Sequence, residues 1–140
     1  MLRSTLLFVL AFFMLAITIR AAPVNHHTLE KRAKTYRGTA TFFSPDSGSE
    51  GGNMGACGKK ESDHDMIVAL NRPQYGNMSK KSKWCGKKIK ITGPKGTAYA
   101  RVNDACPGCD HGDLDLTPAL FKKVVGKFDL GVGKIKWSLA

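Results

Sequence analysis

The segment Arg101–Pro118 reads R-V-N-D-A-C-P-G-C-D-H-G-D-L-D-L-T-P and concentrates the reactive side chains of this chain. It holds two of the four cysteines, one of the four histidines and four of the eleven acidic residues, whereas the whole chain carries a formal net charge of +11. An acidic, cysteine-containing segment in so basic a protein is where binding or chemistry is expected. Its carboxylates are Asp104, Asp110, Asp113 and Asp115, and its histidine is His111.

The N-terminus has the layout of a secretory signal peptide. Arg3 gives a short positive start, Leu6–Ile19 is an almost unbroken apolar run, and Ala21-Ala22 offers small residues for cleavage. The apolar run has 14 residues, whereas a membrane-spanning helix needs roughly 20. We therefore predict a signal peptide at residues 1–21, a secreted extracellular protein, and no membrane segment in the mature form.

Residues 22–32 are predicted to form a pro-segment that ends in the dibasic pair Lys31-Arg32, a site type cut by secretory-pathway proteases. An ordinary disordered tail is the alternative. Removing residues 1–32 takes away four basic residues and one acidic residue, which leaves 108 residues with a net charge of +8. Residues 33–140 are therefore expected to be one domain with one core.

Four cysteines remain in this domain, and a secreted chain with an even number predicts two disulfides with three possible pairings. Zinc is a weaker interpretation, because structural zinc sites use two close ligand pairs and only Cys106 and Cys109 are close. Redox chemistry is also disfavoured, since the C-x-x-C motif runs into the acidic loop Asp110–Asp113 rather than into a helix. We expect no metal and no cofactor. The other two cysteines are Cys57 and Cys85.

The rest of the domain is dominated by short alternating segments. Thr117 is expected to cap one helix that begins at Pro118 and ends at Gly126. Residues 74–83 are expected to be irregular or one helical turn. Short strands with Gly-rich loops and a single helix predict a small all-β barrel. Strands are predicted at 36–43, 66–70, 87–92, 97–103 and 134–139.

Six motifs, in order along the chain, resemble the RlpA-like double-psi β-barrel family, which includes expansins and barwin-type proteins. The resemblance is closest to small, single-domain secreted fungal members and to papain-inhibitor-like proteins, and it spans residues 36–139. The motifs are G-T-A-T-F-F (38–43), G-A-C-G (55–58), W-C-G-K-K-I-K-I (84–91), R-V-N-D-A-C-P-G-C (101–109), G-D-L-D-L-T-P-A-L-F (112–121) and G-K-I-K-W (133–137).

The resemblance implies a six-stranded double-psi barrel with one short helix, disulfide-clamped loops and an open groove, which binds polysaccharide in expansin-like members. It also implies that Cys57 pairs with Cys85 and Cys106 with Cys109. By position, it places Thr41, Asp104 and Asp115 in the groove. His111 and Asp113 are further candidates for binding there.

Asp115 is the candidate for catalysis, with Asp104 as the neighbouring carboxylate that could keep it protonated. Inverting glycoside hydrolysis also needs a second carboxylate roughly 6.5–9.5 Å away. Two departures disfavour catalysis: Cys106 stands where expansin-like proteins have an aromatic residue, and no histidine follows the first strand as in lytic transglycosylases. Asp115 is also placed to stabilise the start of the following helix. We expect binding rather than catalysis.

Lysines form clusters at 80–83 and 87–90. Lys88 and Lys90 share one face of a predicted strand, opposite Ile89 and Ile91. Such a face either keeps the protein soluble or attracts acidic polymers such as pectin-like polysaccharide. Because lysine dominates over arginine and the chain is expected to be secreted, nucleic acid is not an expected partner.

We therefore predict a secreted, non-catalytic, monomeric protein that binds cell-wall polysaccharide or an extracellular protein. A binding protein of this kind can act as an effector. The first alternative is a cysteine-protease inhibitor. The second is a weak glycoside hydrolase or lytic transglycosylase that uses Asp115. Asn77-Met78-Ser79 is in addition a glycosylation sequon.

Overall fold

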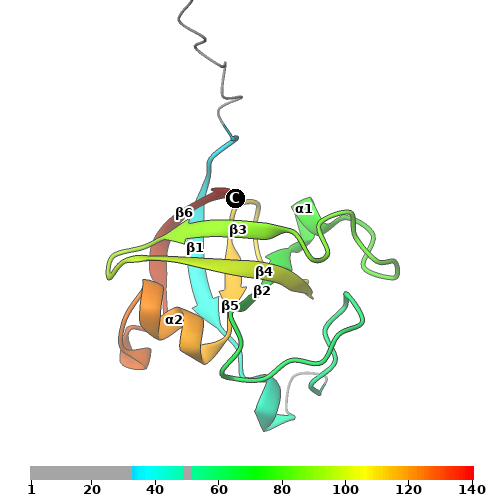
Figure 1. The fold of residues 1–140 in the computed structure, drawn as a ribbon, viewed down its shortest axis with the longest axis horizontal. Coiled ribbons are helices and arrows are strands. Elements are labelled where there is room, and N and C mark those ends of the chain that lie inside the picture. Colours follow the sequence, from blue (N-terminus) through cyan, green and yellow to red (C-terminus); the bar gives the residue numbers. More distant parts are fainter. Residues whose placement is uncertain (1–32, 49–51) are drawn as a thin grey trace, which may run out of the picture. The chain divides into compact units, whose positions relative to one another are not determined.

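Six strands close into a barrel in a computed structural model that describes residues 33–48 and 52–140 (Figure 1). Around the barrel the strands follow the order β1-β5-β2-β4-β3-β6. This confirms the predicted six-stranded barrel, while the predicted signal peptide and pro-segment lie outside the described residues. The strands are β1 (Tyr36–Phe42), β2 (Ile67–Asn71), β3 (Lys88–Thr92), β4 (Thr97–Cys106), β5 (Leu114–Leu116) and β6 (Gly133–Leu139).

Two of the strand pairs are parallel, β1 with β5 and β2 with β4, and the other four pairs are antiparallel. The β2–β4 pair contains a register shift: Val68 pairs with Val102, but Ala69 pairs with Asp104. Asn103 is therefore the extra residue of a bulge, and it is buried directly after the buried Val102. The bulge resets the alternation of β4, so that Asp104 lies on the outer side of the barrel.

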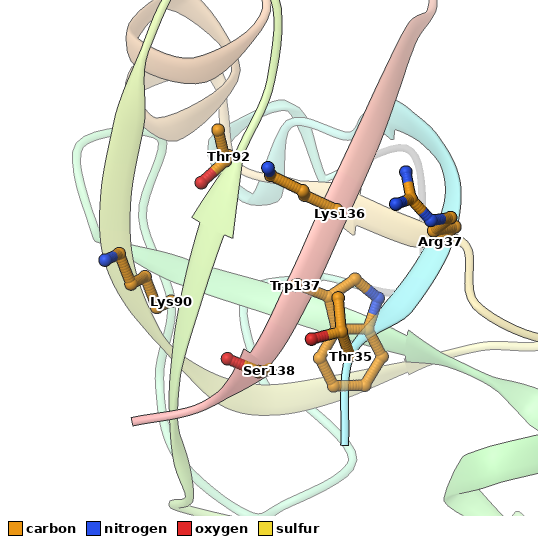
Figure 2. Close-up of a pocket in the computed structure, with 7 residues that line it drawn as sticks. All are labelled: Thr35, Arg37, Lys90, Thr92, Lys136, Trp137 and Ser138. Atoms are coloured by element: carbon orange, nitrogen blue, oxygen red, sulfur yellow. The ribbon is translucent and has the colours of Figure 1, made fainter. Parts of the chain in front are cut away.

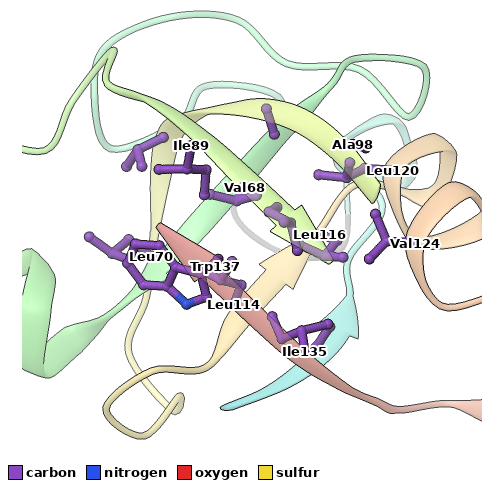
Figure 3. Close-up of a cluster of buried hydrophobic side chains, with 14 of the residues drawn as sticks. Val68, Leu70, Ile89, Ala98, Leu114, Leu116, Leu120, Val124, Ile135 and Trp137 are labelled. Atoms are coloured by element: carbon purple, nitrogen blue, oxygen red, sulfur yellow. The ribbon is translucent and has the colours of Figure 1, made fainter. Parts of the chain in front are cut away.

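The core fills the barrel with the inward-facing residues of every strand (Figure 3). Ile89 and Ile91 of β3 and Leu114 and Leu116 of β5 have no exposed surface, and Trp137 of β6 is 1% exposed. The strand predicted from the Lys-Ile alternation of residues 87–92 is thus present, with one face buried and the other exposed to solvent.

Helices are few and short: α1 (Arg72–Tyr75), α2 (Pro118–Val124) and the 3-10 turns η1 (Pro45–Ser47) and η2 (Phe128–Leu130). The Asn71 side chain caps α1 by accepting a hydrogen bond from the Gln74 backbone N–H at 3.0 Å. Thr117 occupies the N-cap position of α2, as predicted, but its hydroxyl makes no capping bond. It donates instead to the Asp65 carbonyl, because Thr117 is fully buried against the start of β2.

The two disulfides are Cys57–Cys85 and Cys106–Cys109. The pairing implied by the family resemblance is therefore confirmed. The first bridge joins the loop before β2 to the loop before β3, and the second closes the turn at the end of β4. In the described part of the chain, no helix has the length and apolar character needed to cross a membrane.

Candidate functional site

Four residues on four adjacent strands form one row across the outside of the barrel. Asp104 of β4 pairs with Ala69 of β2, Ala69 pairs with Asp115 of β5, and Asp115 pairs with Thr41 of β1. Paired residues of neighbouring strands project to the same face of a sheet. Because the flanking Leu114 and Leu116 point into the core, this face is the outer one. We call Asp104, Ala69, Asp115 and Thr41 the aspartate row.

The aspartate row separates its two carboxylates by one small side chain. Neighbouring strands lie about 4.8 Å apart, so the Cα atoms of Asp104 and Asp115, two strands apart, are separated by roughly 10 Å. Ala69 between them is 3% exposed and adds only a methyl group. The row thus places two partly exposed acceptor groups on either side of a buried alanine.

Each carboxylate of the row accepts a hydrogen bond from a specific donor. The Thr41 hydroxyl donates to Asp115 Oδ1 at 2.6 Å, and the Ala56 backbone N–H donates to Asp104 Oδ1 at 2.7 Å. Ala56 lies beside Cys57, whose own N–H donates to the Asn103 carbonyl at 3.0 Å. The Cys57–Cys85 bridge therefore anchors the turn that orients Asp104.

Of the other two predicted site residues, Asp113 lies beside the aspartate row and His111 does not. Asp113, directly before β5, accepts a hydrogen bond from the Thr39 backbone N–H at 2.6 Å, so it lies on the same outer edge as Asp115. His111 is exposed and its ring lies 5.8 Å from that of Tyr36, which is at the opposite end of β1 from Thr41. Thr41, Asp104 and Asp115 are thus brought together, and His111 is not brought to them.

Glu61 is a buried carboxyl beside the row that the sequence analysis did not single out. It is 4% exposed, and its Oε1 accepts a hydrogen bond from Asn103 Nδ2 at 2.7 Å. Burial, together with the nearby charge of Asp104 acting in the same direction, raises the pKa of Glu61 to about 7. No sequence signal distinguishes it, since Lys59–Asp65 reads as a solvated polar loop.

Glu61 is not presented to a ligand. A Cβ built on Gly55 would come within 2.2 Å of Glu61 Oε1, so the carboxyl lies directly under the backbone of the turn that carries Ala56. The carboxyl with the raised pKa is therefore covered, whereas Asp104 and Asp115 are partly exposed.

Two solved structures of known proteins share the fold of this chain. A *Clavibacter michiganensis* expansin matches with a TM-score of 0.63 and 32% identity, over 76% of this chain and 50% of that one. The *Streptomyces* papain inhibitor matches with a TM-score of 0.63 and 25% identity, over 75% of this chain and 93% of that one. The chain therefore has the double-psi β-barrel fold.

The chain is also similar in sequence to a curated protein. The chain is 34% identical over 95 residues to the Allergen Asp f 7 homolog of *Arthroderma benhamiae*. The match covers 65% of this chain but 33% of the relative, so the chain spans about one third of that protein, as it spans half of the expansin. No family model matches the chain.

One further structure of the same expansin contains an oligosaccharide. It is an aspartate-to-asparagine variant in complex with cellohexaose, and it aligns with this double-psi barrel with the same TM-score of 0.63 and 32% identity.

Proposed function

We propose that this double-psi barrel is a secreted, non-catalytic binding protein whose aspartate row binds a neutral cell-wall polysaccharide of the β-glucan type. The observation that carries the proposal is the alignment of Asp104, Ala69, Asp115 and Thr41 in one outward-facing row. Carboxylates and a threonine hydroxyl are suitable partners for sugar hydroxyl groups. The similar expansin whose variant was solved with cellohexaose supports the choice of ligand.

Secretion is supported by the predicted signal peptide and by the two disulfides, since disulfides persist in oxidising compartments.

The arrangement favours binding over hydrolysis. A general acid must be protonated near the working pH and must reach the glycosidic oxygen. Glu61 has the raised pKa but is covered by the Gly55 turn. Glu61 therefore meets the first requirement but not the second. Asp115 is partly exposed, and the short hydrogen bond that it accepts from the Thr41 hydroxyl holds it as an oriented acceptor for sugar hydroxyl groups.

Retention on insoluble cellulose and chitin, at low and high salt, tests the proposal. We expect retention on cellulose, and Asp104→Ala and Asp115→Ala should each weaken it roughly tenfold or more, because hydrogen bonds to charged groups contribute about 1.5–3 kcal/mol. Asp129→Ala is the matched control, since Asp129 is exposed and lies outside the row. Absence of retention on cellulose, or retention on chitin alone, would refute the proposal.

A reducing-sugar assay tests whether the protein lacks hydrolytic activity. We expect no release of reducing ends from soluble glucans. Release by the wild type that Asp115→Asn abolishes would show that the protein is a hydrolase.

Inhibition of a cysteine protease is a second candidate, favoured by one observation. The match to the *Streptomyces* papain inhibitor covers 93% of that chain, so the two proteins share almost all of one small barrel. The turn closed by Cys106–Cys109 exposes Pro107, Gly108 and Asp110, and a pre-organised loop of this kind suits insertion into a cleft. Unchanged papain activity in the presence of excess protein would eliminate papain as a target.

A further inference from the structure

A second surface lies on the outer side of β1, β6, β3 and β4, and its charged side chains are basic. Its outward-facing positions hold six exposed cations, whereas the residues between them, such as Ile89 and Ile135, are buried. β1, β3 and β6 contain no acidic residue, and the only one in β4 is Asp104, beyond the bulge. We call this surface the basic face. Its cations are Arg37, Lys88, Lys90, Arg101, Lys134 and Lys136.

The strand register places these cations close together. Arg37 pairs directly with Lys136, and Lys88 pairs directly with Arg101. Partners on neighbouring strands lie about 5 Å apart and alternate residues of one strand about 7 Å apart. Like charges at these distances raise the local positive potential, which an anion with several charges can neutralise.

Three cations of the basic face contact uncharged groups within the described part of the chain. Arg101 Nη1 donates to the Gly86 carbonyl at 2.8 Å, and Lys134 Nζ donates to the Thr39 hydroxyl at 3.0 Å. The Lys88 ammonium lies 4.6 Å from the centre of the Tyr99 ring. These contacts orient the cations without cancelling their charge.

The basic face is also hollowed. A cavity of about 430 Å³ lies over β1, β6 and β3, where Arg37, Lys90 and Lys136 alternate with the hydroxyl groups of Thr35, Thr92 and Ser138 (Figure 2). A second cavity of about 240 Å³ shares Arg37, Thr92 and Lys136 with the first and extends to Lys134. Together they form a trough in which cations and hydroxyl groups are interspersed.

We propose that the basic face binds a linear polyuronate, a polysaccharide with a carboxylate on each repeating unit. Repeated carboxylates match the repeated cations, and sugar hydroxyl groups match Thr35, Thr92 and Ser138. Tyr99, which is 49% exposed beside Lys88, offers an aromatic ring at the edge of the same face. Four of the six cations are lysines, which act as point charges, whereas phosphate recognition favours the bidentate fork of arginine.

This site is separate from the aspartate row. In the ring of strands, β3 and β6 stand on the side opposite β2 and β5, with β1 and β4 between them. Failure of one site therefore does not imply failure of the other, and an Asp104→Ala, Asp115→Ala variant should bind polyuronate as the wild type does.

Affinity for polygalacturonate, measured with the full chain at low salt, tests the proposal. We expect binding that weakens steeply with added NaCl, and a loss of about tenfold or more in Lys90→Gln, Lys136→Gln. Lys80→Gln, Lys81→Gln is the control, because it removes the same charge from an exposed loop outside the face and should change the affinity less than about threefold.

Three results would overturn the proposal: no binding by the wild type at low salt, an equal loss in the two double variants, or an affinity for DNA as high as that for polygalacturonate. Absence of binding would mean that the basic face does not bind a polyanion. An equal loss would mean that only the net charge of the protein matters, and equal affinity for DNA would mean that the face does not select a uronate. A selective loss in Lys90→Gln, Lys136→Gln with a preference for polygalacturonate would support it.

Discussion

Replacing Glu61 with Gln should remove a pH dependence from the stability of the barrel. Glutamine keeps the shape of the side chain and an oxygen that accepts the hydrogen bond from Asn103, but it cannot ionise. The variant therefore resembles the protein with Glu61 permanently neutral, which is the form that burial and the charge of Asp104 favour.

The size and sign of the effect follow from the pKa of Glu61. It is 4.5 ordinarily and about 7 in the folded protein. Between these values the folded chain keeps a proton that the unfolded chain has lost, so the free energy of unfolding falls as pH rises, by about 1.4 kcal/mol per pH unit. Over the full interval the loss is about 3 kcal/mol. The stabilising contribution is thus complete below pH 4.5 and lost above about pH 7.

Urea unfolding of the wild type and Glu61→Gln at several pH values from 4 to 8 measures this effect. We expect the two proteins to be similarly stable near pH 4.5 and the variant to be more stable at pH 8, by up to about 3 kcal/mol. Asp129→Asn, which neutralises an exposed carboxylate, should leave the shape of the pH profile unchanged. Parallel profiles for the wild type and Glu61→Gln would refute the reasoning, because they would show that Glu61 has an ordinary pKa in the folded state.

Two further predictions concern the scaffold of the site. Removing the Cys57–Cys85 bridge should lower the free energy of unfolding by about 3.5 kcal/mol, because this bridge closes a loop of 28 residues and so restricts the unfolded chain. That is about twice the cost expected for the Cys106–Cys109 bridge, whose ends are three residues apart. Equal urea midpoints for the two variants would contradict this. Gly38→Ala would place a Cβ 2.3 Å from the Gly112 carbonyl oxygen, and because backbone must move it should cost about 1–3 kcal/mol. Gly108→Ala is the control, because a Cβ at Gly108 meets nothing within 4 Å, and its melting temperature should be nearly that of the wild type. A similar loss of stability in both variants would show that crowding at Gly38 is not the cause.

The barrel could be predicted from the sequence where local patterns are long. The alternation of Lys and Ile in 87–92 and of polar and apolar residues in 134–139 gave strands that differ from β3 and β6 by one residue at one end. β5 was not predicted as a strand, because Leu114–Leu116 has only three residues and its alternation is too short to distinguish from a loop. It forms because both neighbours, β1 and β2, supply hydrogen-bonding partners.

The site was harder to predict than the fold, because its geometry depends on pairing between distant strands. The bulge at Asn103 brings Asp104 into register with Ala69, and nothing within β4 alone indicates it. The predicted strand stopped at Asn103, whereas β4 continues to Cys106. Glu61 was missed for a related reason: its burial comes from the Gly55–Cys57 turn, which the Cys57–Cys85 bridge holds over it.

The barrel's strand order places two surfaces of opposite charge on opposite sides of one small domain. The side of β2 and β5 carries Asp104, Asp113 and Asp115, while the side of β3 and β6 carries lysines. Ionic strength distinguishes the two proposed binding modes, since salt screens exposed charges over about 10 Å at 0.1 M but leaves hydrogen bonds between carboxylates and neutral sugars largely intact. Binding to cellulose that persists at high salt can therefore be attributed to the aspartate row, and binding to polyuronate that disappears there to the basic face.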